Sequence, residues 1–175
     1  VMEHITWWLA LGLILLFLPY FPYSKHAHLF MGPLNIMATA DRKSMAALEK
    51  IDFEDDDIEQ FGAAQIQHLP QTQLLDGYAC IQCSRCQDAC PAYETGKELS
   101  PSALEINKRY FFNENLDILA KGEAIDKALT DWMLTEEAAW SCTTCGYCVE
   151  VCPVGNEPMV DILRARQDLV MMESK

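Results

Sequence analysis

The stretch CIQCSRCQDACP, residues 80–91, places four thiols at intervals of three, three and four residues and ends at a proline. The same spacing recurs in CTTCGYCVEVCP, residues 142–153. Together the two runs hold all eight cysteines of the chain. Whatever these runs bind therefore decides both the fold around them and the chemistry of the protein.

Thiolates are soft ligands, so the candidates are iron–sulfur clusters, zinc, copper or mutual disulfides. Zinc is satisfied by paired C-x2-C knuckles and has no use for a third cysteine three residues on, or for a fourth before proline. Disulfides need an oxidising compartment, which the orientation inferred below disfavours. A C-x2-C-x2-C loop can reach three irons of a cubane, and the full run matches the bacterial pattern in which the fourth cysteine ligates the other cluster.

Two such runs predict two [4Fe–4S] clusters with crossed ligation. The first cluster takes Cys80, Cys83, Cys86 and Cys152, and the second takes Cys142, Cys145, Cys148 and Cys90. Because each run contributes to both clusters, the clusters should be close neighbours between which electrons can pass. Clusters that only hold the fold together are the alternative. Apolar neighbours are expected to shield the sulfurs from water, namely Ile81, Ala89, Tyr93, Tyr147, Val149, Val151 and Val154.

ITWWLALGLILLFLPYFPY, residues 5–23, carries no charged side chain. At about 1.5 Å per residue a helix of this length comes close to the roughly 30 Å of a bilayer core. A secretory signal or a buried core helix are the alternatives, but a basic region before the stretch and a cleavage site after it are missing, and aromatic residues sit at both ends. Basic residues follow the stretch and Glu3 precedes it, so the positive-inside rule places the remainder in the cytoplasm.

The rest of the chain predicts an all-α protein without strands. Ser100 followed by Pro101 predicts a helix start, apolar residues at helical spacing predict a second helix over 124–132, and Pro158 opens a last helix. We expect a transmembrane helix and interface anchor over 1–28, a juxtamembrane amphipathic segment (32–51) and an acidic linker (52–62) within 29–73, and a dicluster domain over 74–175.

The 175 residues include 26 acidic and 13 basic side chains, for a net charge of −13. This balance argues against nucleic acid, whose phosphates require a basic face. It fits a surface that discriminates among partners, or one that only confers solubility. The chain begins Val-Met, which suggests a piece of a longer polypeptide or a subunit of a complex. No catalytic constellation is recognisable, and His68 is interpreted as a surface residue.

About fifty residues of predicted helix separate the runs, which resembles the α-helical ferredoxin domain of heterodisulfide reductase C subunits and succinate dehydrogenase iron–sulfur subunits. FPYSKHAHLFMGPLN (21–35), FGAAQIQHLP (61–70), GYACIQCSRCQDACPA (77–92) and GKELSPSALEINKRY (96–110) are similar to membrane-bound iron–sulfur oxidoreductases related to heterodisulfide reductase, including electron-transfer flavoprotein:quinone oxidoreductases. That family carries a nitrate reductase gamma-like haem b domain before the dicluster domain and cysteine-rich CCG domains after it. This sequence holds only the last helix of the first part and nothing of the third.

The resemblance implies that His28 can ligate a haem b, with the second ligand from another helix or chain. His26 lies about 200° around a helix from His28 and cannot serve the same haem. The alternative is that both histidines and Lys25 are interface residues that reach toward lipid headgroups.

The resulting hypothesis is a single-pass, inner-membrane electron-transfer subunit whose soluble domain faces the cytoplasm. It would relay electrons between a soluble partner, an electron-transfer flavoprotein or CCG-domain protein, and a membrane quinone or haem. Other subunits of a membrane redox complex are expected partners. The alternatives are a fragment of a catalytic heterodisulfide reductase-like enzyme, and a structural accessory of a respiratory or photosynthetic complex.

Overall fold

The computed structural model describes residues 2–39, 51, 53, 54 and 60–175. Throughout these residues the regular structure is helical, no strand is formed, and Gln65 and Ala128 make one isolated antiparallel bridge. The predicted all-α class is confirmed. The second half of the expected amphipathic segment 32–51, and most of the acidic linker, lie outside the described residues.

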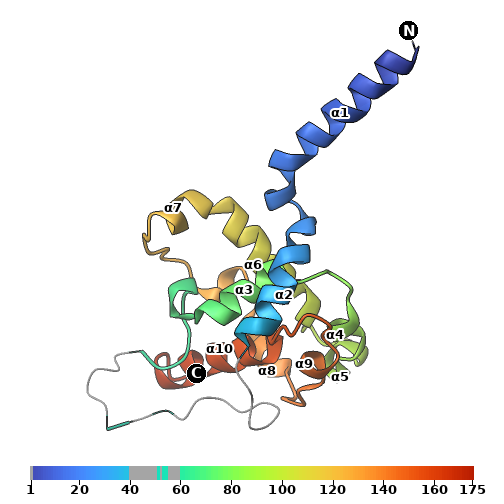
Figure 1. The fold of residues 1–175 in the computed structure, drawn as a ribbon. Helices are drawn as coiled ribbons and strands as arrows, with labels where there is room; N and C mark the ends of the chain where they lie inside the picture. Colours follow the sequence, from blue (N-terminus) through green and yellow to red (C-terminus); the bar gives the residue numbers. More distant parts are fainter. Residues whose placement is uncertain (1, 40–50, 52, 55–59) are drawn as a thin grey trace.

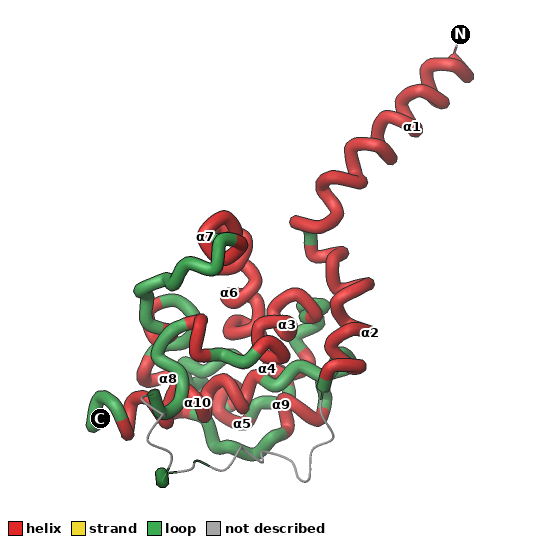
Figure 2. The backbone as a smooth tube through the Cα atoms, turned by 60° about the vertical axis from the view of Figure 1, so that its left-hand side comes forward, coloured by secondary structure: helices red, strands yellow, loops and turns green. Residues whose placement is uncertain are grey.

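The first element, α1 (Met2–Tyr20), continues into a 3₁₀ turn, η1 (Phe21–Tyr23). None of the residues of α1 is buried, and Met2–Tyr23 is long and apolar enough to cross a membrane by length and composition. Figures 1 and 2 show α1 standing clear of the body of the molecule. The predicted apolar helix is therefore present, and no other part of the described chain buries its residues.

The next helix joins α1 to the body. Ser24 opens a turn, η2 (Lys25–Ala27), where its hydroxyl accepts a hydrogen bond from His26 N at 3.2 Å, and α2 (His28–Ala38) follows. In both views α2 runs beside α3 (Gln71–Ala79) (Figures 1 and 2). One face of α2 is buried at Gly32 and Asn35, whereas the opposite face exposes large apolar side chains. The described part of segment 32–51 is thus attached to the body along one side.

The segment before α3 is fastened to the last helix, α10 (Pro158–Met171). Ala63 N donates to Arg164 O at 2.9 Å, and Gly62 adopts a φ of +81°. A Cβ on Gly62 would lie 2.4 Å from both Arg164 O and Asp168 N, so only glycine allows this approach. A short turn, η3 (Ile66–His68), then leads to α3.

Helix α6 (Pro101–Glu114) begins as predicted, because the Ser100 hydroxyl accepts from Ala103 N at 3.1 Å and Pro101 needs no donor partner at this position. After α6 the chain forms α7 (Leu116–Ala120), the short turn η4 (Leu129–Asp131) and α8 (Glu136–Ser141). The start of α10 at Pro158 is also confirmed. The main apolar core joins α6, η4, α8 and α10 through Leu99, Leu104, Leu129, Met133, Leu134, Ala138, Ala139, Ile162, Ala165 and Leu169.

The predicted helix over 124–132 is wrong. Residues 124–128 have no helical structure, and Ala128 is extended, with ψ of 144°. Leu129 N donates to Ala64 O at 2.7 Å, so a bond to a distant segment takes the place of a helical one. Tertiary pairing outweighs local helix propensity here, leaving only the short turn η4.

Candidate iron–sulfur site

The two cysteine runs follow the same backbone path. In each run the first cysteine caps the end of a helix, Cys80 after α3 and Cys142 after α8. The third cysteine lies on a one-turn helix, Cys86 on α4 (Arg85–Asp88) and Cys148 on α9 (Tyr147–Glu150). Left-handed φ angles occur two and four residues after each first cysteine, at Gln82 (57°), Ser84 (62°), Thr144 (55°) and Gly146 (74°). The sequence repeat is therefore also a repeat of structure.

These left-handed residues curl each loop back toward its first cysteine. A residue other than glycine costs roughly 1 kcal/mol or more in this conformation, so the loops hold backbone strain that must be offset. Both loops aim a backbone donor at a sulfur, Gln82 N at Cys80 Sγ and Thr144 N at Cys142 Sγ, each at 3.4 Å. Asn156 N reaches Cys152 Sγ at 3.3 Å. Such bonds orient cluster ligands and favour the thiolate.

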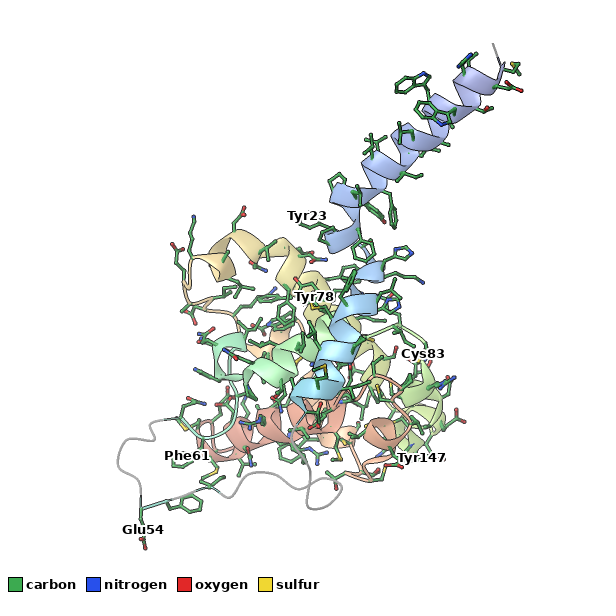
Figure 3. All side chains as sticks on the ribbon, viewed as in Figure 1. Tyr23, Glu54, Phe61, Tyr78, Cys83 and Tyr147 are labelled. Atoms are coloured by element: carbon green, nitrogen blue, oxygen red, sulfur yellow. The ribbon has the colours of Figure 1, made fainter. Side chains whose placement is uncertain are left out.

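The thiols surround two hollows. The first, of about 360 Å³ including its opening to solvent, is lined by Cys80, Cys83, Cys86, Cys148 and Cys152. The second, of about 290 Å³ measured in the same way, is lined by Cys90, Cys142, Cys145 and Cys148. The first hollow meets three thiols of the first run and two of the second, Cys148 and Cys152. The second hollow meets three thiols of the second run and Cys90 of the first, so Cys148 lines both. Figure 3 shows Cys83 of the first run and Tyr147 of the second on the same edge of the body.

The grouping of the thiols around two hollows is compatible with a cluster in each. In the described parts of the chain, no three His, Cys, Asp or Glu side chains are arranged to hold one metal ion. Zn–S bonds of about 2.3 Å would draw four sulfurs to within roughly 4 Å of one another. A cubane instead binds each thiolate at a different iron, so its ligands stand apart around a hollow. The donor set and its arrangement fit a [4Fe–4S] cluster in each hollow.

Burial disfavours the negatively charged thiolate forms of these cysteines unless a metal cation neutralises the charge. It raises the pKa of Cys80 to about 11 and the pKa values of Cys86 and Cys148 to about 12, with neighbouring acidic groups adding to the rise. Burial also raises the pKa of Cys142 and of Cys152. A metal ligand must be deprotonated, so cluster assembly here releases protons and is opposed by acid.

Shielding of the two sites is uneven. Ile81 and Val154 line the first hollow, as predicted. Tyr93 and Tyr147 are 41% and 52% exposed, so the structure does not support the expected shielding by these two rings. Cys83 and Cys145, the second cysteine of each run, are exposed. Each site therefore has one edge at the surface.

A buried ionic cluster lies beside the first hollow. Lys108 is fully buried on α6, and its Nζ donates to Asp161 Oδ2 at 2.6 Å and to Gln73 O at 3.0 Å. Glu105 Oε2 lies 3.0 Å from the same nitrogen, and Glu105 also lines the first hollow. Burial raises the pKa of Glu105 to about 8 despite the opposing effect of Lys108. Burial opposes the charge of Lys108, but the two carboxylates outweigh it and raise the pKa of Lys108.

Sequence reasoning missed this cluster because charged residues are normally assigned to the surface. A signal was present, since Lys108 follows Leu104 by four residues and precedes Phe111 and Phe112 on the buried face of α6. A polar group surrounded by apolar residues at helical spacing is a candidate for a buried, paired ion.

The histidines lie apart from the cysteines. Nδ1 of His28 is hydrogen-bonded to Lys25 O at 2.5 Å, and His26 lies near the Phe17 and Phe21 rings. His68 is partly buried, and its Nδ1 accepts from Ala64 N at 3.3 Å and Gln65 N at 3.4 Å. His68 therefore closes its own turn.

A separate apolar pocket of about 1070 Å³, including its opening, lies between α2, α3, α6 and α7. Its lining is Met31, Ile66, Gln67, Gln71, Leu74, Leu75, Tyr78, Phe112, Leu116, Leu119 and Ala120. In both views α7 lies on the same side of the body as α1, whereas α5 (Pro91–Glu94) and α9 lie on the other (Figures 1 and 2). The pocket therefore occupies the part of the body nearest α1.

Residues 76–156 match the family described as the 4Fe-4S dicluster domain. This segment contains both cysteine runs and the helices between them. The match supports iron–sulfur clusters bound by the cysteines of this segment, and with them a role in electron transfer. No solved structure gives a significant match.

The chain is similar to parts of proteins that are named as iron–sulfur or quinone oxidoreductases. It is 38% identical over 207 residues to the probable iron-sulfur-binding oxidoreductase FadF of Bacillus subtilis, covering 100% of this chain and 29% of the relative. It is 29% identical over 193 residues to the EtfAB:quinone oxidoreductase of Syntrophomonas wolfei, covering 98% and 27%. A probable membrane-anchored ferredoxin of Chromohalobacter salexigens is 29% identical over 142 residues, covering 72% and 21%. The chain thus spans less than a third of the length of each of these relatives.

Proposed function

We propose that this chain is a membrane-anchored relay that carries electrons one at a time through two [4Fe–4S] clusters. The observation that carries the proposal is the crossed arrangement of the thiols around two hollows that share Cys148. Cluster 1 is assigned to Cys80, Cys83, Cys86 and Cys152, and cluster 2 to Cys142, Cys145, Cys148 and Cys90. Two cubanes in adjoining hollows form a conducting pair, whereas one would be enough to hold the fold together.

The clusters supply the one-electron chemistry, and the residues of the chain position and tune them. Backbone N–H groups on the sulfurs of Cys80, Cys142 and Cys152 raise the reduction potentials, and burial lowers them. The exposed edges at Cys83 and Cys145 are the points at which an electron can enter or leave each site. Cys83 exposes one edge of the first hollow and Cys145 exposes one edge of the second, so two redox partners can approach at different edges.

The membrane-side partner is proposed to be a quinone, as the name of the Syntrophomonas relative suggests. The apolar pocket supports this choice, because it lies on the side of α1 and offers polar groups at Gln67, Gln71 and Tyr78. Tyr78 lies two residues before Cys80, so their Cα atoms are at most about 7.6 Å apart. A quinone in this pocket would lie beside cluster 1.

The opposite partner is proposed to be a soluble flavoprotein or a CCG-domain protein, reached on the cytoplasmic side of the inner membrane. The basic residues after α1 and the name of the Chromohalobacter relative support this placement. The acidic balance of the chain suits a partner with a basic docking face.

Quinone oxidation of the reduced clusters tests the proposal. In the full-length protein, reduced anaerobically, a menaquinone or ubiquinone analogue should reoxidise both clusters. Leu75→Trp, which fills the pocket, should slow this step at least tenfold, while Leu34→Trp on the exposed face of α2 should leave it unchanged. Clusters that a quinone never reoxidises would refute the quinone relay, and a Leu75→Trp rate equal to that of wild type would place quinone elsewhere.

Haem b at His28 is a separate proposal. The bond between Nδ1 and Lys25 O leaves Nε2 as the ring nitrogen for an axial bond, which is how ligand histidines are usually oriented. The second ligand would come from another helix. A reduced-minus-oxidised optical spectrum of the full-length protein tests it, since His28→Ala should remove a haem b band that wild type shows.

A further inference from the structure

Helix α2 meets the cluster 1 loop at Gly32 and Asn35. A Cβ on Gly32 would lie 3.3 Å from Val154 Cγ1, so the helix rests directly on the residues that follow Cys152. Asn35, less than one turn further along, is 0% exposed. A fully buried amide at a helix contact is costly unless its hydrogen-bonding groups are used.

Both donors of Asn35 are used. Its Nδ2 donates to Asp76 Oδ1 at 2.7 Å and to Val154 O at 3.1 Å, and Asn156 Oδ1 lies at 3.4 Å. An amide NH₂ has two hydrogens, so the two shorter bonds account for both. The Oδ1 of Asn35 is buried and has no hydrogen-bond partner among the described residues. Asn35 is therefore held in place through its donors.

Asp76 extends the network from α3 to residues that line the first hollow. Its Oδ2 accepts from Glu157 N at 3.0 Å, and its backbone oxygen accepts from Asn156 Nδ2 at 2.7 Å and from Cys80 N at 2.9 Å. Asn156 N in turn donates to Cys152 Sγ at 3.3 Å. The network thus ends on two of the cysteines that surround the first hollow.

We infer that Asn35 is a positioning residue that sets the reduction potential of cluster 1 independently of cluster 2. By holding Val154 O and Asp76, it fixes segment 152–157 so that the N–H of Asn156 stays on the Cys152 sulfur. A hydrogen bond to a ligand sulfur stabilises the more negative, reduced cluster. The inference rests on the proposed assignment of Cys80 and Cys152 to cluster 1.

The test is an EPR-monitored redox titration of the full-length protein carrying Asn35→Leu, which keeps the size of the side chain and removes its donors. The midpoint of one cluster should shift to lower potential, the other should not move, and iron per chain should stay at the wild-type value. Cys83→Ser identifies which signal belongs to cluster 1. Asn107→Leu is the matched control, because Asn107 donates to Met133 O at 3.3 Å, outside the network.

A side-chain exchange gives a second, rescuing variant. Asn35→Asp alone aims a carboxylate at Asp76 and should shift cluster 1 further or release its iron. Combined with Asp76→Asn, it again pairs an amide donor with a carboxylate but leaves Val154 O without its donor, so the midpoint should return part of the way to the wild-type value. A purely structural role for Asn35 would not produce a return confined to one cluster.

If Asn35→Leu fails to fold, Gly32→Ala provides the milder perturbation, because its methyl group displaces the Val154 side chain by a few tenths of an ångström. It should shift the cluster 1 midpoint in the same direction by less. Unchanged midpoints in Asn35→Leu, or equal shifts of both clusters, would overturn the inference. A wild-type protein without two clusters would instead refute the proposed function.

Discussion

At the residue scale, the fourth cysteine of each run decides how the two sites are built. Cys90 follows α4 in sequence, yet it lines the second hollow with Cys142, Cys145 and Cys148. Cys152 likewise lines the first hollow. The cysteine spacing alone predicts that the fourth cysteine of each run ligates the other cluster, because both runs match the spacing of two-cluster ferredoxins.

Single substitutions separate crossed from uncrossed ligation. Cys83→Ser should damage cluster 1, whereas Cys90→Ser should damage cluster 2, because a serine oxygen is a poorer ligand for iron than a thiolate. EPR of each reduced variant, with iron counted on the same sample, is the measurement. Loss of cluster 1 in Cys90→Ser would show that each run serves its own cluster.

Glu105 should give the protein a distinctive pH dependence. Its carboxyl is protonated in folded and unfolded chains below pH 4.5, while between 4.5 and about 8 the unfolded chain ionises and the folded chain keeps the proton. The free energy of unfolding should therefore fall as pH rises through this window, at up to about 1.4 kcal/mol per pH unit. Denaturant midpoints followed anaerobically by circular dichroism at pH 5 and pH 8 measure it.

Glu105→Gln should remove most of this dependence, because an amide does not titrate. The exposed Glu137→Gln should keep it, as that side chain contacts solvent in both states. An unchanged slope in Glu105→Gln would show that Lys108 keeps the Glu105 carboxylate ionised throughout.

At the element scale, local signals predicted some helices and failed for others. Ser100 with Pro101, and Pro158, marked real helix starts because caps and prolines act within one turn. The expected helix over 124–132 failed because Leu129 N pairs with Ala64, a partner that no local pattern shows. The left-handed conformation of Gln82, Ser84 and Thr144 could not be predicted from the sequence either, since only Gly146 has a residue type typical of that conformation.

Substitution of Gly62 should lower the free energy of unfolding, because Gly62 lies directly against the backbone of α10. Gly62→Ala places a methyl group 2.4 Å from backbone atoms of Arg164 and Asp168 and should cost more than about 3 kcal/mol. Gly96→Ala is the control, because Gly96 also has a positive φ (+76°) but open space around it, and should cost only about 1 kcal/mol. Equal shifts of the unfolding midpoint would show that the contact with α10 contributes nothing.

Helix α1 should depend on its apolar middle if it spans a bilayer. Leu13→Arg places a charge near the centre of α1 and should disfavour insertion by about 2.5–3.5 kcal/mol, whereas Leu13→Ala should have little effect. A membrane-insertion assay of segment 1–28 measures both. Equal insertion of the two variants would contradict the transmembrane assignment.

At the scale of the whole molecule, the sequence predicted the class of fold and the cysteine pattern, and it missed the interactions that connect them. The apolar helix, the all-helical body and the paired runs follow from periodicity and spacing. The Asn35 and Lys108 networks do not, because they join residues more than forty positions apart and place polar groups where burial is normally apolar. These long-range bonds hold α2, α3, α6 and α10 around the two hollows.

The measurement that tests the central claim most directly is low-temperature EPR of the anaerobically purified full-length protein in its membrane, reduced with dithionite, with metals counted on the same sample. We expect about eight irons per chain and the broadened signal of two interacting reduced cubanes. Zinc in place of iron, or iron whose signal does not respond to reductant, would contradict the electron-transfer function and leave the two sites as structural supports.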